Sequence, residues 1–232
     1  MRLFFTCFAG FWIALAGAAA AQSERPVVIE LFTSQGCSSC PPADALLAKL
    51  AQREDVIALA LHVDYWDYIG WKDKFASPAF TARQKGYASA NGRSRIYTPQ
   101  MIVNGEHDVV GNRAMDVAEI IEKHRGSVTP VTLSARRMGD MVVIEVSTQR
   151  PVGASDIHVV QYEPEKSVDI GRGENAGRTL DYSHIVTDWS VAGHWSGQGD
   201  FATRAPVAAG KPVVVLVQKE RYGEVLAAAR LR

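Results

Sequence analysis

Hydrophobic and polar positions divide the chain into two halves with different periods. Up to residue 124, apolar runs alternate with stretches of helical spacing, which predicts strands at 27–33, 56–63, 100–103 and 107–110 and helices at 43–50, 72–90 and 115–124. After residue 130 apolar and polar positions alternate, which predicts strands at 131–135, 141–146, 157–162, 184–191, 213–219 and 225–231. Turn-forming residues at 126–130 indicate a boundary between the two halves.

The first 21 residues have the pattern of a secretory signal peptide. Arg2 is their only charge, residues 3–15 are mostly apolar, and the small residues at 19–21 fit a cleavage site. The alternative is an uncleaved anchor, but the run is short of the roughly 20 apolar residues that span a bilayer. We therefore expect a periplasmic or secreted protein with no stable membrane insertion after signal cleavage.

The balance of charge excludes some classes of partner. The chain has 232 residues, with 25 lysines and arginines against 25 aspartates and glutamates, so its formal net charge is zero. Proteins that bind nucleic acid carry a basic surface, and we expect no nucleic-acid partner. The apolar share of 47% is typical of a globular protein, and three cysteines are too few for a disulfide-built scaffold.

The chemistry of the sequence is concentrated in Cys37-Ser38-Ser39-Cys40. Two cysteines separated by two residues, directly after a strand and at the start of a helix, are typical of a redox pair. The positive end of the helix dipole lowers the pKa of a thiol there. We expect Cys37, the more exposed, to be the nucleophile and Cys40 to resolve its mixed disulfides, while Ser38 and Ser39 tune both thiols through hydrogen bonds.

Two alternatives use the same cysteines. A permanently closed Cys37–Cys40 disulfide would make the protein a non-enzymatic binding or scaffold protein. The two thiolates together with a histidine would form a copper site. Half of a zinc site is disfavoured, because no second cysteine pair exists. For the redox pair itself we expect no metal and no cofactor other than the disulfide.

Several segments of the first half resemble the thioredoxin fold. These are residues 28–40, the pair Thr98-Pro99, the hairpin turn Asn104-Gly105 and the closing helix. A longer set of strings resembles DUF1223, an exported bacterial family of unknown function. The strings are residues 30–44, 62–67 and 98–100, with 173–177 similar to that family's C-terminal half. The resemblance then covers nearly all of the mature chain.

This resemblance implies the fold class and the domains. We expect an α/β thioredoxin-like domain with a helical insertion over residues 22–127, followed by a mainly antiparallel β-sandwich domain over residues 128–232. In thioredoxin-like proteins a cis-proline lies opposite the cysteine pair, and its loop binds the substrate backbone. Pro99 holds the matching position, so the resemblance implies substrate contacts for Thr98 and Pro99. The alternative is an ordinary trans-proline at a strand start.

Three further polar residues are candidates for tuning the thiols. Glu30 lies in a strand expected to be buried, and a buried carboxyl with a raised pKa would pass a proton to Cys40. Alternatively, Glu30 is a polar core residue whose hydrogen bonds are satisfied by a partner side chain. His62 and Asp64 share one face at the end of a strand, where they would tune the thiolates or bind a ligand. The simpler interpretation is capping and loop hydrogen bonding.

Two loops suggest contacts near the cysteine pair. The aromatic residues at 65–71 form either a lid or peptide-binding wall beside Cys37, or packing for the inserted helix. The glycine-rich segment 171–177 lacks the strand-to-helix context of a nucleotide-binding loop. It predicts a long loop of the second domain that touches the first, with Glu174, Asn175 and Arg178 as candidates for binding a partner.

The sequence therefore predicts an exported thiol–disulfide oxidoreductase. Cys37 and Cys40 would exchange disulfides with protein substrates, which Thr98 and Pro99 would position. An unidentified redox partner would restore the pair after each reaction.

Overall fold

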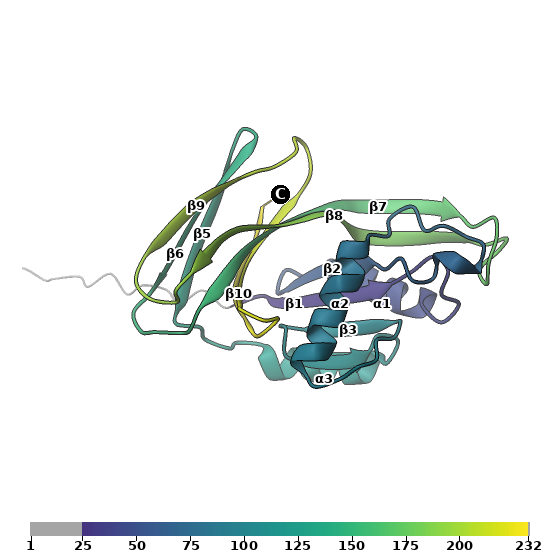
Figure 1. Ribbon diagram of the computed structural model, residues 1–232, viewed down its shortest axis with the longest axis horizontal. Helices are drawn as coiled ribbons and strands as arrows, with labels where there is room; N and C mark the ends of the chain where they lie inside the picture. Colours follow the sequence, from purple (N-terminus) through teal and green to yellow (C-terminus); the bar gives the residue numbers. More distant parts are fainter. Residues whose placement is uncertain (1–24, 232) are drawn as a thin grey trace, which may run out of the picture.

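Strands dominate residues 25–231, the part of the chain described by this computed structural model (Figure 1). The large sheet contains β1 (Val27–Thr33), β2 (Val56–His62), β3 (Gln100–Val103), β4 (His107–Val110), β7 (Ser155–Asp169), β8 (Thr179–Trp195), β10 (Val213–Lys219) and β11 (Val225–Leu231). The small sheet contains β5 (Val131–Met138), β6 (Met141–Thr148) and β9 (Phe201–Pro206). The helices are α1 (Pro41–Ala51), α2 (Pro78–Ala90), α3 (Ala114–His124) and the 3-10 turn η1 (Asp67–Ile69). The expected signal peptide, residues 1–21, lies outside the described residues.

The large sheet runs through both halves of the sequence. Its strand order is β11-β10-β7-β8-β2-β1-β3-β4. Strands β1 and β2 are parallel, whereas β3 is antiparallel to β1. Strand β8 pairs in parallel with β2 where Ile185 lies opposite Ala60. Strands from before and after the segment 126–130 therefore belong to one hydrogen-bonded layer.

This architecture contradicts the expected fold class. The described chain is mostly β, with an eight-stranded mixed sheet, a three-stranded sheet and short α-helices of 11, 13 and 11 residues. It is not an α/β thioredoxin-like domain with a helical insertion followed by a β-sandwich. The physical reason is the pairing at β2. An open strand edge presents unpaired N–H and C=O groups. Strand β8 covers this edge through Ile185, which lies 125 residues after its partner Ala60, and hydrophobic periodicity cannot reveal such a distant pairing.

Two apolar layers cover the faces of β1, because successive side chains of a strand point to opposite sides. Ile29 and Leu31 belong to the layer that contains Leu47 of α1 and Ile121 of α3. Phe32 belongs to the opposite layer, with the α2 side chains. Helix α2 crosses that face of the sheet (Figure 1). A polar side chain on β1 or β2 therefore reaches either α1 or α2, but not both.

The hairpin of β7 and β8 links the two ends of the molecule. Its strands have 15 and 17 residues. Near one end Val159 and Trp195 pack with Val142 and Val215 in a core shared with the small sheet. The tip at the other end lies beside the loops that follow β1 and β2 (Figure 1). The sequence predicted only the apolar middle of each strand, because most of residues 163–167 are exposed and polar.

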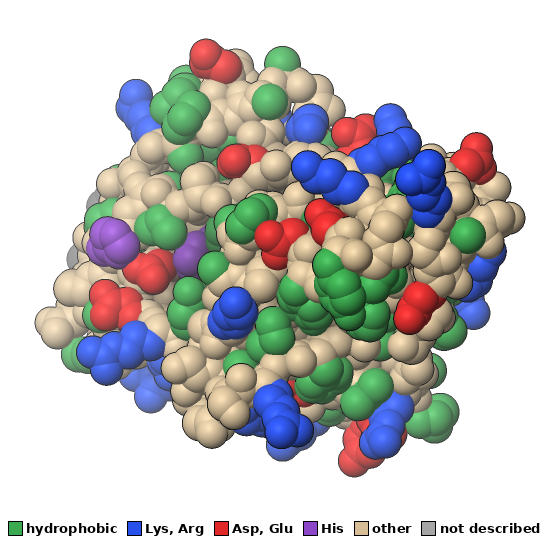
Figure 2. Space-filling model, turned by 45° about the vertical axis from the view of Figure 1, so that its right-hand side comes forward, with side chains coloured by type: hydrophobic (Ala, Val, Ile, Leu, Met, Phe, Trp, Pro, Cys, Tyr) green, Lys and Arg blue, Asp and Glu red, His purple; other side chains and the backbone are tan. Residues whose placement is uncertain are grey.

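The surface shows no segregation of charge on the face seen in Figure 2, where acidic and basic side chains are interspersed. This distribution agrees with a formal net charge of zero. Within residues 25–231, no helix is both long and apolar enough to cross a bilayer.

Candidate functional site

The two cysteines form a disulfide at the start of α1. Cys37 and Cys40 are bonded, with Cα atoms 5.4 Å apart. Cys40 is the N-cap of α1 and the amide of Asp44 donates to its carbonyl at 3.1 Å. Proline can occupy the first helical position because the amide there needs no intrahelical acceptor, and Pro41 follows directly. The sequence thus folds the pair onto the positive end of a helix, as predicted.

Burial of the pair differs from the expectation that Cys37 is exposed. Both cysteines are 0% exposed, whereas Ser38 and Ser39 between them are exposed. The Ser39 hydroxyl lies 3.9 Å from the Cys37 sulfur, a long contact for a hydrogen bond. An incoming thiol therefore cannot reach either sulfur until part of the surrounding structure moves.

The loop between β7 and β8 holds the segment that carries the cysteines. The Asn175 side-chain amide donates to the carbonyls of Gln35 at 2.9 Å and of Cys37 at 3.0 Å. Asn175 is only 1% exposed. On the surface, the Ser38 amide donates to the Glu174 carboxylate at 3.2 Å, and hydrogen bonds from Ser38 hold the pKa of Glu174 below its usual range. Asn175 is thus a clamp on the cysteine segment.

The expected substrate-contact pair lies beside the same segment. The Thr98–Pro99 bond is cis, as predicted. The Trp66 indole donates to the Thr98 hydroxyl at 2.8 Å. At Gly111, an added Cβ would lie 3.2 Å from the Ala43 side chain and 3.3 Å from that of Pro99. The glycine therefore lets Pro99 approach the first turn of α1.

The aromatic segment bridges the two loops around the disulfide. The Trp71 indole donates to the Gln35 side chain at 2.8 Å. Its ring also lies 3.3 Å from the position of a Cβ on Gly171. Tyr68, which lies between Trp66 and Trp71 in the sequence, is 82% exposed. Trp71 thus packs against the loop between β7 and β8, and the lid or peptide-binding wall stays a prediction.

Glu30 lies on the face of the sheet away from α1, so it is not placed to exchange a proton with Cys40. Its carboxylate accepts two hydrogen bonds from Arg83, at 2.6 and 2.9 Å, and one from Tyr87 at 2.6 Å. Glu30 and Arg83 are both buried. The structure therefore shows the alternative, in which hydrogen bonds from partner side chains satisfy Glu30.

His62 and Asp64 have separate roles. The Asp64 carboxylate accepts from the Thr81 hydroxyl at 2.6 Å and so attaches the end of β2 to α2. His62 is 0% exposed, and its Nδ1 lies 2.7 Å from the Asp73 carboxylate. That carboxylate also accepts from the Gln35 amide at 2.8 Å. Burial raises the pKa of Asp73, but His62 and these hydrogen bonds outweigh it and the pKa is lowered.

Asp44, which the sequence analysis missed, is the buried carboxyl beside the cysteines. It lies one helical turn after Cys40, and residues four apart are neighbours on a helix. Burial raises the pKa of Asp44 to about 7, opposed by attraction to His62. A weak hydrogen bond from the Thr33 hydroxyl also opposes this rise. Within the described residues, no hydrogen bond of ordinary length reaches the Asp44 oxygens, His62 Nε2 or the Tyr182 hydroxyl. Buried polar groups of this kind bind water, so we expect a hydrated polar cluster behind the disulfide.

Comparison with known proteins identifies the family. Residues 28–218 match the family of proteins of unknown function DUF1223. The chain belongs to this family. The DUF1223 protein is 35% identical to a protein from Agrobacterium tumefaciens known from a crystal structure, over 91% of this chain and 96% of that one, with a TM-score of 0.77. HBP35 of Porphyromonas gingivalis has a similar fold, with a TM-score of 0.62 and 13% identity over 90% of this chain and 75% of its own. No curated protein sequence matches the chain.

The described part of this DUF1223 chain offers one cluster of three potential metal ligands. It consists of Asp156, His194 and Glu220 and includes neither cysteine. His194 Nδ1 lies 2.6 Å from the Asp156 carboxylate, so hydrogen bonding already engages this group. The third ligand that the copper alternative requires is therefore not gathered around the cysteine pair in this arrangement of the described residues.

Asn175→Ala should loosen the clamp on this DUF1223 disulfide. The change leaves the buried Gln35 carbonyl without a donor, and the Cys37 carbonyl keeps only the Cys40 amide. An unsatisfied buried acceptor typically costs about 1–3 kcal/mol, and this favours local opening. We expect dithiothreitol to reduce the disulfide about tenfold faster or more, measured by thiol titration over time. Glu174→Gln, at an exposed neighbour, is the control and should change the rate little. An unchanged rate in Asn175→Ala would mean that the loop does not gate the disulfide.

Proposed function

We propose that the protein is a thiol–disulfide oxidoreductase whose redox-active pair is Cys37 and Cys40. The observation that carries the proposal is a disulfide closed directly before the first turn of α1, with Pro99 packed beside that turn. A helix N-terminus stabilises a thiolate and so makes it a better leaving group. The proposal includes export, supported by the signal-peptide pattern of residues 1–21 and by the persistence of disulfides outside the cytoplasm.

The chemistry is two successive exchanges. The Cys37 thiolate attacks a substrate disulfide, forming a mixed disulfide and releasing one substrate sulfur as a thiolate. The Cys40 thiolate then attacks Cys37 Sγ, which forms the Cys37–Cys40 disulfide and releases the second substrate sulfur. Two electrons pass to the substrate, and an external dithiol partner reduces the pair again. In the oxidising direction every step runs in reverse.

Substrate access requires the cysteine segment to open. Both sulfurs are buried, and the loop that carries Asn175 lies over the segment. Exposed Tyr68 and the backbone around Thr98 are the surfaces that would receive a protein substrate once the segment is open. The proposed enzyme is therefore closed at rest, and its rate depends on opening as well as on thiol chemistry.

One observation favours a second candidate, a scaffold with a structural disulfide. A sulfur pair at 0% exposure is what a permanent cross-link requires. In that case the clamp by Asn175 would protect the bond, and the function would lie elsewhere on the surface.

The reduction potential of the pair separates the two candidates. The protein is equilibrated with glutathione and dithiothreitol buffers, and free thiols are counted. A potential of about −120 to −270 mV covers known oxidants, isomerases and reductants and is the result we expect. A bond that stays closed below about −300 mV belongs to the structural class and would overturn the redox proposal.

Single cysteine variants test the order of events. Cys40→Ala should accumulate mixed disulfides with a disulfide-containing substrate protein such as insulin, because no resolving thiol remains. Cys37→Ala should accumulate none and should lose exchange activity, because the proposed mechanism assigns the attack on the substrate to Cys37. Mass spectrometry of trapped adducts distinguishes the variants. Full exchange activity in Cys37→Ala would contradict the mechanism.

A further inference from the structure

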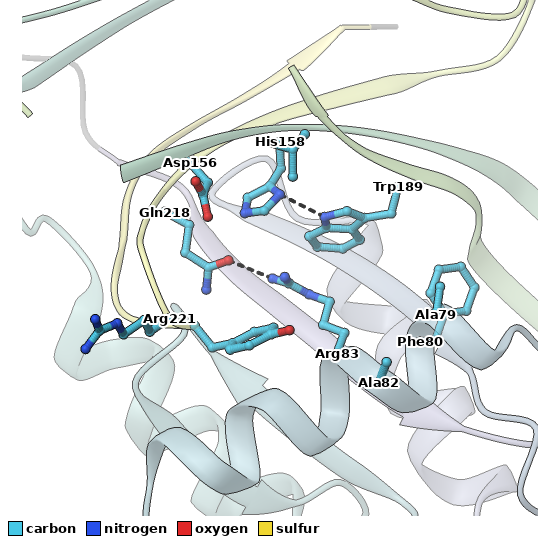
Figure 3. A pocket seen from close by; sticks show the side chains of 11 residues that line it. Ala79, Phe80, Ala82, Arg83, Asp156, His158, Trp189, Gln218 and Arg221 are labelled. Atoms are coloured by element: carbon cyan, nitrogen blue, oxygen red, sulfur yellow. Dashed lines mark hydrogen bonds between the residues drawn. The ribbon is translucent and has the colours of Figure 1, made fainter. Parts of the chain in front are cut away.

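A second candidate site lies between α2 and the strands of the second half, away from the disulfide. It is a cavity of about 390 Å³ (Figure 3). Small-molecule sites begin at about 300 Å³ and combine apolar walls with a few directed polar groups. Ala82 and Arg83 line it from α2, His158 from β7, Trp189 and Val191 from β8, and Tyr222 from the turn after β10.

Two unfavourable backbone features place the Tyr222 ring at the wall of the cavity. Tyr222 and its neighbour Arg221 both have φ of 61°, a left-handed conformation that non-glycine residues rarely adopt. Gly86 lies inside α2, where glycine costs about 1 kcal/mol relative to alanine. A Cβ at Gly86 would overlap the Tyr222 ring. Both features serve to hold this ring against the helix at the edge of the cavity.

The mouth of the cavity exposes apolar surface. Val191 is 48% exposed and Tyr222 is 37% exposed, although both are large hydrophobic residues. A ligand with an apolar body would remove this surface from water, which stabilises the complex by about 25 cal/mol per Å² of apolar area buried.

Hydrogen-bond donors occupy the floor. Arg83 is only 7% exposed, and its guanidinium lies 3.8 Å from the centre of the Trp189 ring. Its Nε and Nη2 donate to Glu30, and Nη2 also to Tyr87 and Gln218. In the described part of the chain, no group accepts a hydrogen bond from Nη1. This nitrogen can therefore donate to a ligand.

His158 provides a second donor. The Trp189 indole donates to its Nδ1 at 3.1 Å (Figure 3). Burial, reinforced by the positive charge of Arg83, lowers the pKa of His158 to about 3, so the ring is neutral. A neutral imidazole that accepts at Nδ1 carries its proton on Nε2. The Gln218 side chain interacts with this N–H in the ligand-free protein, and a ligand oxygen would take its place.

We propose that this cavity binds a small organic carboxylate with an aromatic body. The carboxylate accepts hydrogen bonds from Arg83 Nη1 and His158 Nε2, while the body packs against Val191, Tyr222 and the Ala82 methyl group. Glu30 already balances the charge of Arg83, and Asp156 at the mouth adds a negative charge next to His194. Binding therefore depends on directed donors and apolar contact, and a dissociation constant of about 0.1–1 mM is expected for a ligand of some ten heavy atoms.

Three matched probes test the ligand chemistry. The probes are 3-phenylpropionate, the neutral 3-phenylpropionamide and the cationic 3-phenylpropylamine, titrated into the protein at pH 7. Binding is followed by the shift of the Trp189 indole N–H signal, which a Trp189→Phe variant assigns. We expect saturable binding of the carboxylate, at least tenfold tighter than that of the other two. Equal binding of all three, or no saturable shift with the carboxylate, would overturn the proposal.

Two substitutions on α2 locate the site. Ala82 is exposed and lines the cavity, so Ala82→Leu fills the cavity without disturbing the core. We expect it to weaken binding of 3-phenylpropionate at least tenfold. Ala90→Leu makes the same change at an exposed position of the same helix outside the cavity and should leave binding unchanged. Binding that survives Ala82→Leu would contradict the assignment, whatever the cysteine pair does.

Discussion

Replacing Glu30 by Leu should lower the free energy of unfolding by about 3–5 kcal/mol, the usual cost of breaking a buried ion pair on one side. Arg83 would remain buried with no opposite charge, because its guanidinium is held between the sheet and the Trp189 ring. The Tyr87 hydroxyl would also lose its acceptor. Urea unfolding at pH 7, followed by tryptophan fluorescence, measures the loss.

The double variant Glu30→Leu/Arg83→Met isolates the cause. With both charges gone, no unpaired charge stays in the core, and such replacements are often neutral or stabilising. We expect the double variant to be more stable than Glu30→Leu alone. Arg53→Ala is the exposed comparison. It breaks the pair with Asp55, whose side chains are 31% and 41% exposed, and should cost less than about 1 kcal/mol. A cost this small for Glu30→Leu would mean that the core pair is not desolvated.

The expected role of Glu30 failed because a strand carries two faces that lead to different helices. The expected burial of Glu30 suggested a proton donor for Cys40, whereas the alternation along β1 directs its side chain to Arg83 of α2. Asp44 had a readable signal that the analysis passed over. It lies at i+4 from Cys40 and three residues before Leu47, on the buried side of α1. A carboxylate in that position is expected to be buried with a raised pKa.

Local motifs could be predicted from the sequence, whereas the residues that meet in long-range contacts could not. The disulfide partners and the cis bond at Pro99 follow from residues that lie close together in the sequence or match a short pattern. The loop 171–177 was expected to touch the first half, and its Asn175 does reach Cys37 across 138 residues, but the residue that it binds there was not predicted. The pairing of β8 with β2 was not expected at all. The spacing of apolar residues along the chain does not identify which distant segments contact each other. For this reason the strands themselves were largely predicted, while the eight-stranded sheet that joins the two halves of the chain was not.

Asp44→Asn should make the protein more stable at pH 8 and should nearly abolish one part of its pH dependence. The Asp44 pKa is about 7 in the folded chain against an ordinary value of 3.8. The folded state therefore binds a proton that the unfolded state releases between these values, and stability falls as pH rises from about 4 to about 7. A shift of about three pKa units corresponds to about 4 kcal/mol of unfolding free energy that the parent protein loses as Asp44 ionises. Asp44→Asn avoids this loss because asparagine does not ionise.

Urea unfolding of Asp44→Asn and of the parent protein at pH 4.5, 6 and 8 tests this linkage. The difference in free energy of unfolding should grow with pH in favour of Asn and level off above pH 7. Glu119→Gln removes one exposed carboxylate from α3 and should follow the parent curve, since an exposed group has nearly the same environment in both states. Curves for Asp44→Asn and the parent that stay parallel would show that Asp44 ionises normally, and that the polar cluster behind the disulfide is open to solvent.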